Sequence, residues 1–143
     1  MEKQIFTDEL AAEVLPVRRS DGHKGDFGRV SITGGSVGFT GAPVLAAYGA
    51  ARSGSGLVFL GVPDPVYPIV AGHCLEVMPS PLPADRGKIS KDAFFPILEQ
   101  LNSCDAGLLG PGLGRSQDLP KLISKILEET ETPLILDADG LYA

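Results

Sequence analysis

Cysteine, histidine and basic residues are scarce in this sequence, and each scarcity argues against a class of protein. The 143 residues include two cysteines and two histidines, with no Cys-x-x-Cys or Cys/His spacing of the kind that binds a metal ion. We therefore expect no metal site, and we expect Cys74 and Cys104 to be free, buried thiols. The 12 lysines and arginines are outnumbered by 18 aspartates and glutamates, and the resulting net charge of -6 argues against a nucleic-acid partner.

Long apolar segments and the common nucleotide-binding signatures are missing as well. No hydrophobic run approaches the roughly 20 residues that a helix needs to cross a bilayer, so we expect no membrane partner. Residues 1–4 show no apolar signal-peptide core, and the cytoplasm is therefore the expected location. There is neither a G-x-x-x-x-G-K-S/T loop nor a regular G-x-G-x-x-G sequence. No acid–base pair or nucleophile–histidine arrangement is evident, so we predict no catalytic residue in this chain.

What the sequence does contain is an ordinary share of apolar residues and an excess of glycine. The hydrophobic fraction of 43% and the charged fraction of 21% are typical of a folded protein, and the length fits a single domain over residues 1–143. The 18 glycines gather at a few positions instead of forming a low-complexity tract. This clustering predicts tight turns.

Segments rich in β-branched residues alternate with helical segments along the chain. We predict strands at residues 29–33, 57–62, 75–78, 105–109 and 133–137, and helices at residues 7–15, 42–53, 64–72, 90–101 and 119–129. Thr7 is expected to cap the first helix and Pro16 to end it. Residues 18–29 and the proline-rich residues 79–88 are predicted to be connections. Such alternation predicts an α/β fold with a mostly parallel sheet and helices on both faces.

Two glycine-rich segments and one aspartate turn directly follow predicted strands. These are GGSVGFTG at residues 34–41, GPGLG at residues 110–114 and DADG at residues 137–140. Glycine lets the backbone approach a ligand closely, and the N-terminus of a following helix attracts anions. Ligands of parallel sheets bind at the carboxyl ends of the strands, where all three segments should meet. The pattern therefore predicts a site for the phosphates of a nucleotide-like ligand, with plain tight turns as the alternative.

The candidate ligand contacts are polar groups and glycines of these segments. Hydroxyls come from Ser36 and Thr40, and Asp137 or Asp139 would hold a ribose hydroxyl or a hydrated metal ion. Asp139 has an alternative role as the cap of a helix that begins at Gly140. Lys24, in a glycine-containing loop before the first strand, is a candidate phosphate contact, with a solvated lysine as the alternative.

Four segments in this order resemble one known family. They are DGHKGDFGRV at residues 21–30, GGSVGFTGAPVLAAYGAARSGSGLV at residues 34–58, GPGLG at residues 110–114 and LDADGL at residues 136–141. The combination is similar to the ADP/ATP-dependent NAD(P)H-hydrate dehydratases, which have a ribokinase-like α/β fold. The resemblance runs from about Asp8 to the last residue.

The resemblance implies a function in nucleotide repair. Such enzymes dehydrate hydrated NADH or NADPH, with ADP or ATP as cosubstrate and Mg²⁺ as a candidate cofactor; the hydroxyl of the hydrate is phosphorylated and then eliminated as phosphate. By the family pattern, Ala42 and Gly112 contact the hydrated dinucleotide. The remaining loop residues expected to line this pocket are Gly35, Ser36, Thr40, Gly41 and Gly114. On this reading Gly112→Val should abolish binding and leave the fold intact, and Ala42→Leu should block the pocket.

Two later family motifs do not occur in these 143 residues. They are a Pro-His-Pro-Gly-Glu-like turn and a Gly-Gly-Thr-Gly-Asp-like anion hole whose aspartate is the catalytic base. The chain is therefore expected to be the N-terminal part of the domain, with the catalytic aspartate outside it. A homo-oligomer or a second chain that supplies the C-terminal half is the expected assembly. A ribokinase-like small-molecule kinase and a non-catalytic nucleotide-binding fragment remain as alternatives.

Overall fold

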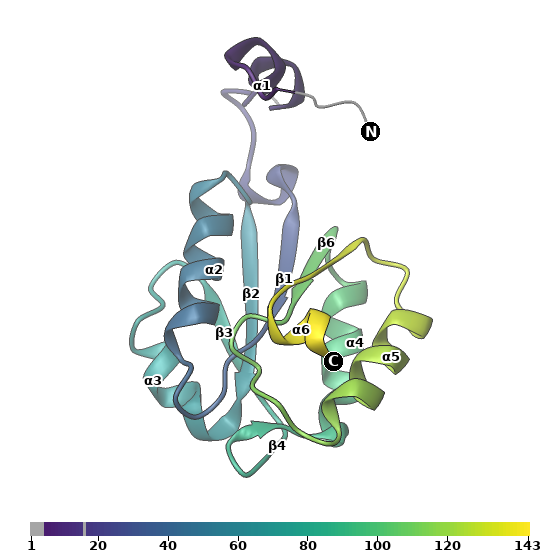
Figure 1. The fold of residues 1–143 in the computed structure, drawn as a ribbon. Helices are drawn as coiled ribbons and strands as arrows, with labels where there is room; N and C mark the ends of the chain where they lie inside the picture. Colours follow the sequence, from purple (N-terminus) through teal and green to yellow (C-terminus); the bar gives the residue numbers. More distant parts are fainter. Residues whose placement is uncertain (1–4, 16) are drawn as a thin grey trace.

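The computed structural model describes residues 5–15 and 17–143 (Figure 1). Residues 1–4, discussed above for a signal peptide, and Pro16, predicted to end the first helix, lie outside this part. The elements, with single 3₁₀ turns marked η, are α1 (Asp8–Val14), η1 (Lys24–Phe27), β1 (Arg29–Thr33), α2 (Gly41–Arg52), β2 (Leu57–Pro63), η2 (Asp64–Val66), α3 (Tyr67–Ala71), β3 (Met78–Leu82), β4 (Ala84–Asp85), β5 (Lys88–Ile89), η3 (Lys91–Ala93), α4 (Phe94–Asn102), β6 (Ala106–Leu109), α5 (Leu119–Glu129), β7 (Leu134–Leu136) and α6 (Asp139–Tyr142).

Five of the strands form one sheet in the order β3-β2-β1-β6-β7, and every pairing in it is parallel. The first strand in the sequence, β1, lies at the centre of the sheet. The following strands β2 and β3 lie on one side of β1, and the later strands β6 and β7 lie on its other side. Ile32 of β1 pairs with Leu60 of β2 and with Leu108 of β6. The winding direction therefore reverses between β1 and β6, and the carboxyl ends of the strands at such a reversal are where open α/β sheets bind their ligands.

Helices cover both faces of the sheet, as the alternation predicts. One buried cluster joins Ile32, Val58 and Leu60 of the sheet to Ala47 of α2 and Val70 of α3. Successive residues of a strand point to opposite faces, so the neighbours of Ile32 face the other layer. There Gln100 of α4 donates a hydrogen bond from Nε2 to Oγ of Ser31 at 2.9 Å. The two-layer covering explains why β2 is almost wholly apolar.

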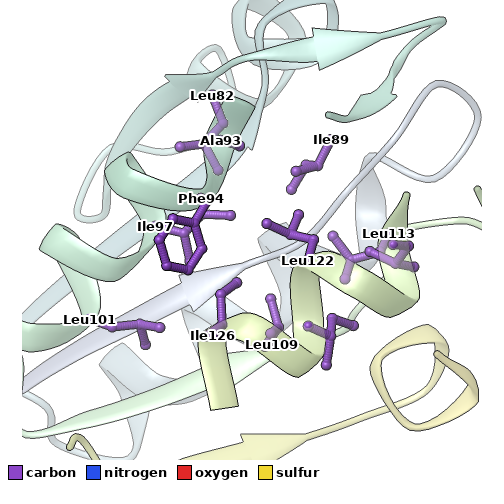
Figure 2. Close-up of a cluster of buried hydrophobic side chains, with 12 residues drawn as sticks. Leu82, Ile89, Ala93, Phe94, Ile97, Leu101, Leu109, Leu113, Leu122 and Ile126 are labelled. Atoms are coloured by element: carbon purple, nitrogen blue, oxygen red, sulfur yellow. The ribbon is translucent and has the colours of Figure 1, made fainter. Parts of the chain in front are cut away.

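The second buried cluster lies under α4 and α5 (Figure 2). Leu101 of α4, Ile126 of α5 and Leu109 of β6 are each at most 2% exposed. Full burial of such side chains stabilises the fold by about 1.5–3 kcal/mol each. Leu113 belongs to the same cluster, so its burial anchors the loop after β6 to the core. On α5, Leu122, Ile123 and Ile126 are buried, whereas Leu127 is 46% exposed.

The prediction for the third strand was wrong in position. The strand spans Met78–Leu82 and contains Pro79 and Pro81, which had suggested a connection. The two prolines lie two residues apart, so their missing N–H groups fall on the same side of the strand. An edge strand such as β3 has one side without a partner, and proline is tolerated there. The same proline-rich segment also contains the antiparallel β4–β5 hairpin, which the sequence did not reveal.

The remaining elements lie close to their predicted bounds. Thr7 accepts a hydrogen bond from the backbone N–H of Leu10 at 3.3 Å and caps α1. The predicted helix at residues 90–101 begins with η3, and α4 starts only at Phe94, because Pro96 fits only in the first turn. Cys74 and Cys104 are free and buried as predicted, and burial raises the pKa of both thiols. Within the described ranges, none of the helices has the length and apolarity needed to span a membrane.

Candidate functional site

The two glycine segments lie at the reversal point of the sheet. The first glycine loop, residues 34–40, follows β1, and the second glycine loop, residues 110–114, follows the neighbouring strand β6. Both leave the carboxyl edge of the sheet, where open α/β sheets bind their ligands. The expected convergence of these segments is therefore present in the structure.

The two glycine loops are bonded directly to each other. The N–H of Gly35 donates to the carbonyl of Pro111 at 2.8 Å, and the N–H of Gly110 donates to the carbonyl of Thr33 at 3.1 Å. The side chain of Ser36 is fully buried, and its hydroxyl donates to the carbonyl of Gly112 at 2.8 Å. Ser36 thus braces the loops from inside. Its predicted contact with a ligand is not supported by this placement and stays a prediction.

Close loop packing is the local reason for glycine at residue 112. Gly112 has φ +68°, and a Cβ there would lie 2.8 Å from the carbonyl oxygen of Phe39. The same Cβ would lie 3.3 Å from Cβ of Ala42, so Gly112 and Ala42 face each other across the loops. The expectation that Gly112→Val leaves the fold intact is wrong, because the added side chain would strain the backbone and press on the first glycine loop.

The aspartate turn closes the group of loops. The carboxylate oxygen Oδ2 of Asp139 accepts a hydrogen bond from the N–H of Gly114 at 2.8 Å. Asp139 is the first residue of α6 and makes no capping bond there, so the alternative that it caps a helix from Gly140 is wrong. Asp137 is exposed, and Ala138 between them has φ +45°, an uncommon value for a residue with a Cβ. Of the two aspartates, Asp137 is the one free to reach a ligand.

The start of α2 offers a second set of groups at this edge. Gly41 and Ala42 are exposed in its first turn, and Thr40 makes no side-chain cap. The first N–H groups of α2 therefore lack a capping side chain, and they carry the partial positive charge of the helix. Thr40 and Gly41 line a small cavity of about 100 Å³ beside Ile69 and His73.

The β4–β5 hairpin covers the glycine loops and was missed in the sequence. The N–H of Val37 in the first glycine loop donates to the carbonyl of Gly87 at 2.8 Å. Nζ of Lys88 donates to the carbonyl of Arg115, just beyond the second glycine loop, at 2.5 Å. Arg86 and Gly87 both have positive φ, the signature of a two-residue type I′ turn. In the sequence, the only sign of this hairpin turn is the dipeptide Arg86-Gly87, and arginine is uncommon in the first position of such a turn.

Lys24 does not lie at this site. It belongs to η1, which precedes β1, and its carbonyl packs against Gly56, which precedes β2. Lys24 therefore lies at the amino edge of the sheet. In Figure 1 this edge is the one nearer α1, whereas the hairpin lies at the opposite end. A cavity of about 720 Å³ at the amino edge is larger than those near the loops. Of its two arginines, Arg18 donates to the carbonyl of Gly54, and Arg19 forms an ion pair with Asp21.

The assembled groups suit binding better than bond making. Backbone N–H donors, a helix start and nearby cations fit the phosphates of a nucleotide, and the one exposed carboxylate fits a ribose hydroxyl. Among the described residues no group of three or more His, Cys, Asp or Glu is placed to hold a metal ion.

Comparison with known proteins identifies the family. The sequence model of the NAD(P)H-hydrate dehydratases matches residues 30–143. The bifunctional NAD(P)H-hydrate repair enzyme of Moorella thermoacetica is 40% identical over 142 residues, which cover 99% of this chain and 27% of that enzyme. The chain thus spans about a quarter of the length of this relative.

Solved structures confirm the expected ribokinase-like fold. The ADP/ATP-dependent NAD(P)H-hydrate dehydratase of Bacillus subtilis, co-crystallised with ATP and Mg²⁺, is 27% identical with a TM-score of 0.72 and covers 94% of this chain and 46% of its own. A ribokinase-like superfamily protein of Enterococcus faecalis is 21% identical with a TM-score of 0.75, over 99% of this chain and 50% of its own, and has the same fold. Since the family model covers the sequence from residue 30 onward, this chain belongs to the NAD(P)H-hydrate dehydratase family.

Proposed function

We propose that this chain forms the dinucleotide-binding part of an enzyme that dehydrates hydrated NADH or NADPH, with ADP or ATP as cosubstrate. The observation that carries the proposal is the pair of interlocked glycine loops at the reversal point of the sheet, in a member of this family. Residues 1–143 form the N-terminal part of one ribokinase-like domain. The catalytic aspartate lies outside this chain.

Each part of the site has a separate task in this proposal. Ala42 and Gly112 line the dinucleotide pocket, and their small size lets the two glycine loops pack closely at its wall. The first turn of α2 faces the dinucleotide phosphates with its N–H groups. Asp137 accepts a hydrogen bond from a ribose hydroxyl, and Asp139 keeps Gly114 in position. ATP or ADP supplies the phosphoryl group that turns the hydroxyl of the hydrate into a leaving group, and Mg²⁺ enters with that nucleotide.

The assembly is part of the proposal. The proposed assembly is a homo-oligomer, or a complex with a second chain that carries the C-terminal half and its catalytic aspartate. A reducing compartment such as the cytoplasm fits two cysteines that are both free.

Ala42→Leu tests the pocket. Ala42 is exposed, so leucine is tolerated by the fold, and the larger side chain enters the space facing Gly112. We expect NADH and NADPH to bind at least about tenfold more weakly, which corresponds to about 1.4 kcal/mol. Titration calorimetry of wild type, Ala42→Leu and the small control Ala42→Ser measures this. Equal affinities for all three proteins would remove Ala42 from the pocket.

Turnover separates the proposed function from its alternatives. Hydrated NADH is incubated with the chain and ATP or ADP, with and without a polypeptide that carries the C-terminal half, and recovery of NADH is followed by its near-ultraviolet absorbance. We expect recovery only when both parts are present. Binding without turnover in every combination would favour a non-catalytic fragment, and phosphorylation of small-molecule precursors such as vitamin precursors would favour a kinase.

A further inference from the structure

Three cations border the site beyond the second glycine loop, and we call Arg86, Lys88 and Arg115 the basic rim. They line a cavity of about 460 Å³ whose other lining residues are Asp85, Ser116, Gln117 and Asp118. The basic rim adjoins the glycine loops directly. A Cβ on Gly114 would lie 3.4 Å from Cε of Lys88, and Arg115 is the next residue of the chain.

The rim cations are not neutralised by ion pairs. Within the described part of the chain, the three ion pairs involve Arg19, His23 and Lys125, and none involves the rim. Two carboxylates, those of Asp85 and Asp118, line the same cavity, so the local balance is one positive charge in a chain of net charge -6. The lining of this cavity thus carries one net positive charge beside the glycine loops.

The side chains of Lys88 and Arg115 are held by contacts that do not neutralise their charges. Lys88 donates to the carbonyl of Arg115, and the guanidinium of Arg115 stacks 3.7 Å from the ring centre of Tyr142. Arg86 is exposed at the tip of the hairpin with φ +48°, a conformation that favours asparagine or glycine. Backbone conformations of this kind tend to persist at functional sites, and here the conformation directs an arginine to the border of the cavity.

We propose that the basic rim binds a phosphate monoester of the dinucleotide, namely the 2′-phosphate that distinguishes NADPH hydrate from NADH hydrate. This inference rests on the proposed function, because the glycine loops must hold the dinucleotide first. The first turn of α2 and the glycine loops serve the phosphates that both dinucleotides share. The cations outside the loops then meet the one group that only NADPH carries, and arginine suits a phosphate dianion by its forked hydrogen bonds.

The experiment follows the backbone amide signals of the ¹⁵N-labelled chain while NADH, NADPH or ATP is added. We expect NADPH to shift the signals of residues 34–42 and 110–114 and also those of residues 86–88 and 115–117. NADH should shift only the loop signals and bind about tenfold more weakly, and the difference should shrink at high salt because exposed charges are screened. In the double variant Arg86→Asn and Arg115→Gln the preference for NADPH should disappear.

Asparagine retains the positive φ of residue 86, so the hairpin keeps its turn. Arg52→Gln is the matched control, because this exposed arginine lies at the end of α2 away from the rim. Equal binding of both dinucleotides with shifts confined to the glycine loops would overturn the rim and leave the proposed function standing. Rim shifts with ATP but not with NADPH would overturn the 2′-phosphate assignment. The absence of any shift with either dinucleotide would overturn both proposals.

Discussion

At the scale of single residues, the glycines of this site first allow the protein's own backbone segments to pack closely, and ligand contact is a second role. Gly110 packs against the carbonyl of Asp137, and Gly112 packs against the carbonyl of Phe39. Ser36, whose hydroxyl was predicted to contact a ligand, is buried and donates a hydrogen bond to the carbonyl of Gly112. A glycine after a parallel strand is therefore evidence for close backbone packing first, and evidence for ligand contact only at positions that stay open.

The cost of a side chain at residue 112 can be measured. Gly112→Ala combines positive φ with a contact to Phe39, whereas Gly38→Ala has φ +91° and nothing within 4 Å of the added Cβ. We expect Gly38→Ala to lower the free energy of unfolding by about 1–2 kcal/mol, the ordinary cost of a left-handed backbone. Gly112→Ala should cost about 1 kcal/mol more because of overpacking. Urea denaturation measures both values, and equal losses would show that the contact to Phe39 relaxes freely.

At the scale of elements, helices and the hairpin determine where the loops can be. Leu113 belongs to the buried cluster that includes residues of α4 and α5, and the hairpin holds both glycine loops through Val37 and Lys88. The aspartate turn at residues 137–140 completes the arrangement through Asp139. These contacts join segments that are far apart in the sequence, so the site keeps its shape only when the elements pack together.

Alanine substitutions of Asp139 and Asp137 should have different effects, the first on the stability of the fold and the second on dinucleotide binding. Asp139→Ala leaves the buried N–H of Gly114 without its carboxylate acceptor, and we expect a loss of about 2 kcal/mol in the free energy of unfolding. Asp137→Ala removes an exposed carboxylate, so stability should change by less than about 0.5 kcal/mol while dinucleotide binding weakens. Thermal unfolding and calorimetric titration of both variants test this. A destabilised Asp137→Ala or a stable Asp139→Ala would reverse the two roles.

At the scale of the whole molecule, apolar side chains remain exposed at two ends of the structure. At the amino edge, α1 buries none of its residues, and Phe6 and Leu15 are 71% and 61% exposed. The second exposed group lies on β7, which is an edge strand of the sheet, and its Ile135 is 64% exposed. Open strand edges and apolar patches of this kind favour association with further protein.

Native mass spectrometry of the purified chain tests association. We expect species heavier than the 14.9 kDa of one chain, because the exposed apolar groups gain from burial. Copies of this chain would show a homo-oligomer, and a second polypeptide would show that the site is assembled from two pieces. A mass of 14.9 kDa alone, at concentrations where dinucleotide binds, would contradict association.

The sequence alone determined the parallel α/β architecture, the strand-end position of the glycine loops and the family. These follow from local patterns: β-branched segments, glycines after strands, and motifs whose order along the chain is itself informative. The edge strand β3 and the β4–β5 hairpin were missed because proline-rich sequence predicts a connection unless the strand is known to be at an edge, and only tertiary packing decides that.

Only the tertiary structure decided which candidates share the site. Lys24 lies close in sequence to the first glycine loop but at the opposite edge, because β1 runs between them. Arg86 and Arg115 are far apart in sequence but border one cavity, because the hairpin folds back over both loops. Local patterns specify which element a residue belongs to, whereas the end of the sheet that it reaches, and the partners it meets there, depend on how all the elements pack.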